Sequence, residues 1–150
     1  MGSQLILASN PEASLSSLTG RRLACLGLLM ATIPCGLIVR MAPLGLPYVV
    51  TKYGGSMLWA VALYWLLGAL LPNLRPQKLV VVALIVSAGL EFTRLWHTPA
   101  TNAFRLTLAG KLLLGRIFSL KNIAAYWVAI GFTASIDYLF RRADAPKASR

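Results

Sequence analysis

Four long apolar runs divide the chain, and shorter polar segments separate them. The runs occupy about residues 23–39, 55–71, 79–96 and 122–140, so each holds 17 to 19 residues. A helix needs about 20 predominantly apolar residues to cross the hydrocarbon core, with a usual range of about 17 to 25. The pattern therefore predicts an all-α integral membrane bundle of about four transmembrane helices.

A fifth apolar run, residues 106–118, has only 13 residues and is too short to span. It also contains two basic residues, Lys111 and Arg116. Such a segment suits the membrane surface better than the hydrocarbon core. We therefore predict a short interfacial or re-entrant helix at residues 106–118.

The polar segments complete the predicted organisation of the chain. Residues 1–20 predict a flexible N-terminal arm or a short surface helix, and residues 143–150 predict a polar C-terminal tail. Between them, residues 21–142 form one predicted transmembrane domain. Residues 40–54 contain two prolines and two glycines, which favour a loop between the first two spans.

The overall composition excludes an ordinary soluble domain. Of the 150 residues, 57% are hydrophobic and 13% are charged, and the mean hydropathy is +0.68. A soluble domain carries about 25% charged residues because its exterior faces water. The net charge of +11 would suit nucleic acid, but the basic residues stand singly or in pairs at the edges of apolar runs. That placement is typical of anchors against anionic lipid headgroups, so we expect no nucleic-acid partner.

The basic residues also bear on the orientation of the chain. With the N-terminus inside, the cytoplasmic segments hold eight Lys and Arg and the opposite side holds seven, which leaves the positive-inside rule undecided. The pairs Arg21-Arg22 and Arg141-Arg142 adjoin the first and last spans, where the bias acts most strongly. We therefore predict that both termini are cytoplasmic.

Glu91 is an ionisable residue inside the third apolar run, and such residues are costly in a membrane. Arg94 follows three positions later, so the two side chains can meet on one helix face. One interpretation is a structural ion pair or an interhelical tie, with Arg94 or Arg105 neutralising the carboxylate. The other is a carboxylate that binds a ligand or takes part in catalysis.

Several basic residues share one side of the membrane in the four-span arrangement. The candidate ligand-binding residues on that side are Arg40, Lys52, Glu91, Arg94 and Arg105. Arginine contacts phosphate through two parallel hydrogen bonds, so this set predicts a site for an anionic headgroup or a phosphorylated lipid carrier. The alternative is that long basic side chains simply reach the interface from the span ends.

The remaining chemistry-bearing residues give little support for a cofactor or an active site. His97 is the only histidine, and without a cluster of other ligands it makes a poor metal site. Cys25 and Cys35 would be about 15 Å apart along one helix, too far for a disulfide. Asp137 precedes Arg141 by four residues, so a local ion pair accounts for it. We expect no catalytic residue, no metal and no cofactor, and the sequence favours a non-enzymatic protein.

Several short motifs carry a family resemblance. The segment from Lys52 to Ala60 resembles the pattern Lys-Tyr-x-Gly-Asp-x-Leu-Trp-Ala of a family of small bacterial integral membrane proteins, the domain of unknown function 2809. Further elements match in the same order: Arg40, Leu46-Pro47, Glu91, Leu95-Trp96, Arg105-x-Thr107-x-x-Gly110, Leu113-Leu114-Gly115-x-x-Phe118-Ser119 and Ala125-Tyr126. The resemblance covers about residues 21–135 and implies the bacterial inner membrane but no assigned reaction. A more distant similarity is to the VanZ-like glycopeptide-resistance membrane proteins.

The chain departs from that family pattern at four positions. Ser56 and Asn122 replace two usual aspartates, Arg94 replaces a glutamine, and Leu120 replaces a tryptophan. Two carboxylates are therefore missing. Any acid-dependent activity that the family implies would rest on Glu91 alone.

These observations support three hypotheses about function. The leading one is a non-enzymatic membrane protein that binds anionic lipid or a lipid-linked envelope precursor. The second is a small transporter or an assembly partner in a membrane complex, which would work as a homo-oligomer or with another membrane protein. The third is a membrane enzyme that acts on lipid-linked substrates.

Overall fold

The fold is all α-helical over the part of the chain that the computed structural model describes, residues 11–41, 45, 47–95, 98–107, 110 and 118–144. The long helices are α1 (Pro11–Met41), α2 (Tyr48–Leu70), α3 (Pro76–Phe92) and α6 (Leu120–Asp144). A 3-10 turn (Thr93–Leu95) extends α3, and the short helix α4 (Pro99–Leu106) follows it.

Proline marks the start of several helices. Pro47 directly precedes α2, while Pro76 and Pro99 occupy the first turns of α3 and α4. Proline suits a helix start because the first turn leaves its N–H groups unpaired in any case. At α4, Thr98 completes a capping box with Thr101, in which each side chain bonds the other residue's backbone N–H.

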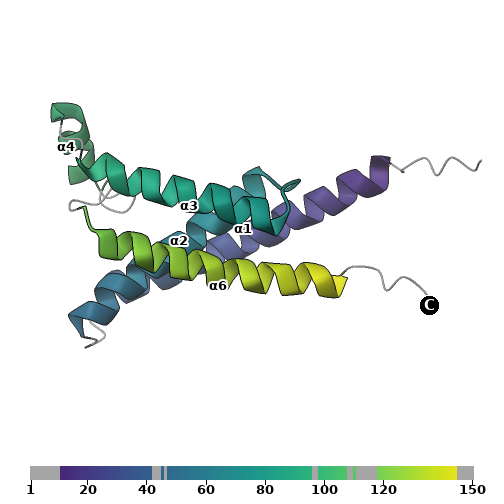
Figure 1. Ribbon diagram of the computed structural model, residues 1–150, viewed down its shortest axis with the longest axis horizontal. Helices are drawn as coiled ribbons and strands as arrows, with labels where there is room; N and C mark the ends of the chain where they lie inside the picture. The colour runs from purple at the N-terminus through teal and green to yellow at the C-terminus, as the bar shows by residue number, and fades with distance from the viewer. Residues whose placement is uncertain are drawn as a thin grey trace, which may run out of the picture.

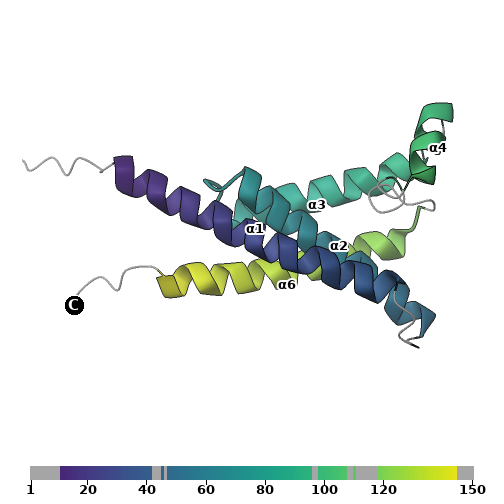
Figure 2. The same ribbon diagram turned by 180° about the vertical axis from the view of Figure 1, so that it is seen from behind.

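The long helices run alternately up and down the bundle (Figure 1). Helix α2 is central and packs against α1, α3 and α6, and α6 also packs along α3. The end of α1, the start of α2, the end of α3 and the start of α6 therefore lie at one end of the bundle, here called the Arg40 end. The opposite end, which holds the start of α1 and the last turns of α6, is called the Asp137 end. Figure 2 shows the same arrangement from behind.

Small residues and aromatic rings fill the centre of the bundle. Tyr64, Tyr126, Leu79 and Ile130 are almost fully buried. Large apolar side chains face outward instead, and Ile85 and Phe132 remain 66% and 69% exposed. An apolar exterior of this extent is suited to lipid rather than water.

Within the described part of the chain, three helices are long and apolar enough to cross a membrane: Ser16–Met41, Tyr48–Leu70 and Leu120–Arg142. A fourth crossing is added if Pro76–Leu95 and Pro99–Leu106, which are bent by 110° relative to each other, count as one broken span. The predicted all-α membrane bundle is therefore confirmed.

Three details of the predicted organisation differ in the structure. Helix α1 begins at Pro11, so residues 11–20 are helical, while residues 1–10 lie outside the described part. Helix α2 begins at Tyr48, so the last seven residues of the predicted loop at residues 40–54 are helical. Helix α6 continues through Asp144, into the predicted tail. In each case the helix extends beyond the apolar run. Hydropathy indicates only the part of a helix that lies in the hydrocarbon core, and the helix can continue outside it.

The predicted interfacial helix at residues 106–118 falls mostly outside the described residues. The short helix that the structure does describe, α4, lies just before it at Pro99–Leu106. Its exposed Phe104 and Leu106 place apolar side chains at the outer edge of the bundle.

Candidate functional site

The five predicted ligand-binding residues all lie at the Arg40 end, as the alternating direction of the helices requires. They belong to two separate corners, however. Arg40 and Lys52 lie at the corner between α1 and α2, and Arg94 and Arg105 lie at the corner between α3 and α4. Figure 1 shows these corners on opposite sides of the start of α6.

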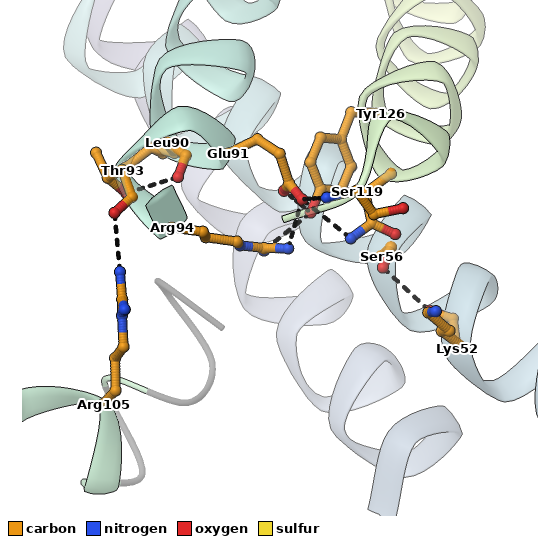
Figure 3. A network of polar contacts seen from close by, with 10 residues as sticks. Lys52, Ser56, Leu90, Glu91, Thr93, Arg94, Arg105, Ser119 and Tyr126 are labelled. Atoms are coloured by element: carbon orange, nitrogen blue, oxygen red, sulfur yellow. Dashed lines mark hydrogen bonds and ion pairs between the residues drawn. The ribbon is translucent and has the colours of Figure 1, made fainter. Parts of the chain in front are cut away.

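Glu91 lies at the centre of a buried polar cluster between α3 and α6, here called the Glu91 cluster (Figure 3). Its side chain is fully buried, and its Oε1 accepts hydrogen bonds from Arg94 Nη1 at 2.8 Å and from Asn122 Nδ2 at 3.2 Å. Its Oε2 accepts from the Tyr126 hydroxyl at 3.0 Å, which in turn accepts from Arg94 Nη2 at 3.1 Å. The predicted Glu91–Arg94 pair is confirmed as a contact.

The same carboxylate also caps α6. Its Oε1 accepts from the backbone N–H of Ser119 at 2.9 Å, at the very start of that helix. The first N–H groups of a helix lack partners within it, and the positive end of the helix dipole favours an anion there. These contacts favour the interpretation of Glu91 as an interhelical tie between α3 and α6.

Arg105 also makes a structural contact. It is 4% exposed, and its Nη2 donates to the carbonyl oxygen of Thr93 at 2.8 Å. This bond joins α4 to the end of α3 across the sharp bend (Figure 3). Arg105 is thereby engaged in holding the corner.

Arg40 and Lys52 are exposed. The aliphatic part of Arg40 packs on Gly55 of α2. A Cβ atom added at Gly55 would lie 3.7 Å from the Arg40 Cβ, in van der Waals contact. The Lys52 ammonium lies 5.7 and 5.5 Å from the ring centres of Tyr48 and Tyr53, within reach of cation–π attraction. In the part of the chain that the structure describes, neither cation has a carboxylate partner.

An apolar groove leads away from Arg40 between α1 and α2. Its volume is about 420 Å³, and its walls include Leu29, Ile33, Leu58 and Trp59. Arg40 is the one charged residue of this lining. Trp59 also packs on Tyr126 of the Glu91 cluster, with 5.3 Å between ring centres, so the groove adjoins that cluster.

A second buried carboxylate, Asp137, ties the helices at the Asp137 end. It is 5% exposed and forms the predicted ion pair with Arg141, at 3.0 Å. It also accepts from the Tyr64 hydroxyl at 2.8 Å and from Arg21 Nη1 at 3.3 Å. The four residues are here called the Asp137 cluster.

The Arg21 and Tyr64 contacts were not predicted from the sequence. Arg21 precedes Asp137 by 116 positions and Tyr64 precedes it by 73. A spacing rule within one helix carries no information about such partners. Arg141 adds a bond to the Leu74 carbonyl oxygen at 3.1 Å, so this cluster links α1, α2, α6 and the turn before α3.

No group of three His, Cys, Asp or Glu residues that could hold a metal is found among the residues described by the structure. Both cysteines are free thiols, with Cys25 buried and Cys35 exposed.

The fold and its polar clusters define a helical membrane protein whose helices are joined at both ends by a buried carboxylate. A family model described as Protein of unknown function (DUF2809) matches residues 45–132, which is more than half of the chain. The chain therefore belongs to this family. No solved structure matches it. The more distant similarity to the VanZ-like proteins stays a prediction.

Proposed function

We propose that this chain is a multi-pass protein of the bacterial inner membrane that binds an anionic lipid or a lipid-linked envelope precursor at the Arg40 end. One observation supports it above the others: Arg40 lines the end of an apolar groove, and both Arg40 and Lys52 are exposed cations without carboxylate partners among the described residues. A phosphate-bearing headgroup would supply the missing anion. Glu91, Arg94 and Arg105 support this surface by holding α3, α4 and α6 in place.

The lipid interaction is tested by native mass spectrometry of the purified protein. We expect the double variant Arg40→Ala/Lys52→Ala to lose most of its co-purified anionic lipid. The matched control is Arg75→Ala/Lys78→Ala, which removes the same two types of charge from exposed positions at the opposite end. Equal lipid retention in the two double variants would reject the proposal.

The proposed orientation places both termini in the cytoplasm. It is supported by the position of Arg21-Arg22 and Arg141-Arg142, which the fold brings to the same end of the bundle. Reporter fusions after residues 48 and 105 test it, because both points belong to the Arg40 end and should report the periplasm. A cytoplasmic signal from both would reverse the orientation, and signals from opposite sides would remove the shared surface altogether.

A further inference from the structure

The groove between α1 and α2 has the length of one membrane leaflet. On α1 its lining runs from Leu29 to Arg40, which is 11 positions. At about 1.5 Å per residue, this distance is roughly 16 Å. The hydrocarbon core of a bilayer is about 30 Å thick, so one leaflet is about 15 Å deep. Arg40 therefore stands at headgroup level when the apolar part of the groove lies in the leaflet.

The chemistry of the lining changes only at that end. Apart from Arg40 and the half-buried Thr32, every lining residue is apolar. The Thr32 hydroxyl already donates to the Leu28 carbonyl oxygen at 2.7 Å within its own helix. The groove thus presents an apolar wall that ends in a single cation, which matches the charge distribution of an anionic lipid.

The two kinds of lining indicate the occupant. The apolar part of the groove, with a volume of about 420 Å³, suits hydrocarbon, and the Arg40 guanidinium at its end suits a phosphate. A lipid carries these two groups in one molecule, with the acyl chain in the leaflet and the phosphate at headgroup level.

We infer that the α1–α2 groove holds an acyl chain of an anionic lipid, drawn from the leaflet at the Arg40 end, with Arg40 on the lipid phosphate. This inference rests on the proposed function and adds the position of the bound acyl chain. The wall opposite Arg40's helix includes Ala62 of α2, where a larger side chain would occupy the space of the acyl chain.

The experiment measures binding of dioleoyl phosphatidylglycerol and of its single-chain lyso form to detergent-purified protein, by native mass spectrometry titration. We expect Ala62→Phe and Arg40→Ala each to weaken binding of both lipids about tenfold. Ala31→Phe is the matched control, because Ala31 is exposed on α1 and outside the groove lining, and it should bind as the unaltered protein does. Inorganic phosphate at millimolar concentration should not displace either lipid.

The outcomes separate the inference from the proposed function. If Arg40→Ala loses binding while Ala62→Phe does not, or if inorganic phosphate displaces the lipid, the headgroup alone is recognised and the acyl-chain site is rejected. If Ala62→Phe loses binding while Arg40→Ala does not, Arg40 does not hold the phosphate and the inference is rejected, while the proposed function is still decided by the double variant Arg40→Ala/Lys52→Ala.

Two further controls address loss of folding and dimer formation. Thr32→Phe fills the groove from the more exposed helix α1, and it replaces Ala62→Phe if that variant loses helical content in circular dichroism. A protein that is dimeric without lipid and becomes monomeric in Ala62→Phe would show that a second copy fills the groove, which would overturn the inference.

Discussion

The Asp137 cluster makes a prediction about stability that the structure allows to be estimated. Tyr64→Phe removes only the hydroxyl group, and the buried ring keeps its edge-to-face contact with Trp65. The lost interaction is one hydrogen bond of 2.8 Å to a carboxylate. Hydrogen bonds to charged groups contribute about 1.5 to 3 kcal/mol, while interhelical bonds measured in membranes reach only about 1.7 kcal/mol. We therefore expect a loss of about 1.5 kcal/mol.

Asp137, the acceptor of that hydrogen bond, provides an internal control. Asp137→Ala should cost about 3 to 5 kcal/mol, because it leaves Arg21 and Arg141 without their acceptor. In that background the Tyr64 hydroxyl has lost its acceptor as well, so Tyr64→Phe should have almost no further effect. The double-mutant cycle should then give a coupling energy of about 1.5 kcal/mol between Tyr64 and Asp137.

The assay is unfolding by dodecyl sulfate in mixed micelles, followed by far-ultraviolet circular dichroism. Tyr138→Phe is the matched control, because Tyr138 is the residue after Asp137 and is 47% exposed. The reasoning is refuted if Tyr64→Phe is as mild as Tyr138→Phe. It is refuted equally if Tyr64→Phe costs the same with and without Asp137.

The same unfolding assay tests three other contacts. Glu91→Ala should lose about 3 kcal/mol or more, and Glu91→Gln should lose less because an amide oxygen can still cap α6. Arg21→Leu should lose about 1 to 2 kcal/mol, whereas Arg22→Leu, at an exposed position, should change stability by less than about 0.5 kcal/mol. A Cβ at Gly68 would lie 3.0 Å from the Cys25 Sγ, so Gly68→Ala should destabilise by about 1 kcal/mol, and Cys25→Ala should relieve that loss. Equal effects of Gly68→Ala in both backgrounds would contradict this packing argument.

The membrane class of the fold could be predicted because lipid imposes a simple rule on sequence. Every lipid-facing stretch of a span must be apolar, so continuous runs reveal the spans. The rule does not extend to helix ends, which leave the hydrocarbon and become polar. Helix α1 accordingly starts at Pro11, 12 residues before its apolar run, and α2 starts at Tyr48, seven residues before its own.

The candidate site was predictable only where one helix contains both partners. Glu91 with Arg94 and Asp137 with Arg141 follow from spacings of three and four residues. The contacts of Asp137 with Arg21 and Tyr64 depend on how α1 and α2 dock on α6. Docking is determined by the packing of small residues such as Gly54 and Gly68, which the pattern of apolar runs does not encode.

Two of the four positions at which this chain departs from the resembled pattern gain a common explanation from the Glu91 cluster. Arg94 and Asn122, which replace a usual glutamine and a usual aspartate in the pattern that the sequence resembles, both donate hydrogen bonds to Glu91. An aspartate at position 122 would place a second carboxylate beside Glu91, and two carboxylates at that distance need a shared proton or a cation. Here Arg94 provides the positive charge and Asn122 provides an N–H donor, so the cluster is neutral. A Glu91 carboxylate whose charge is balanced by Arg94 is suited to joining helices, and among the described residues at this end Arg40 and Lys52 are exposed cations available to a ligand.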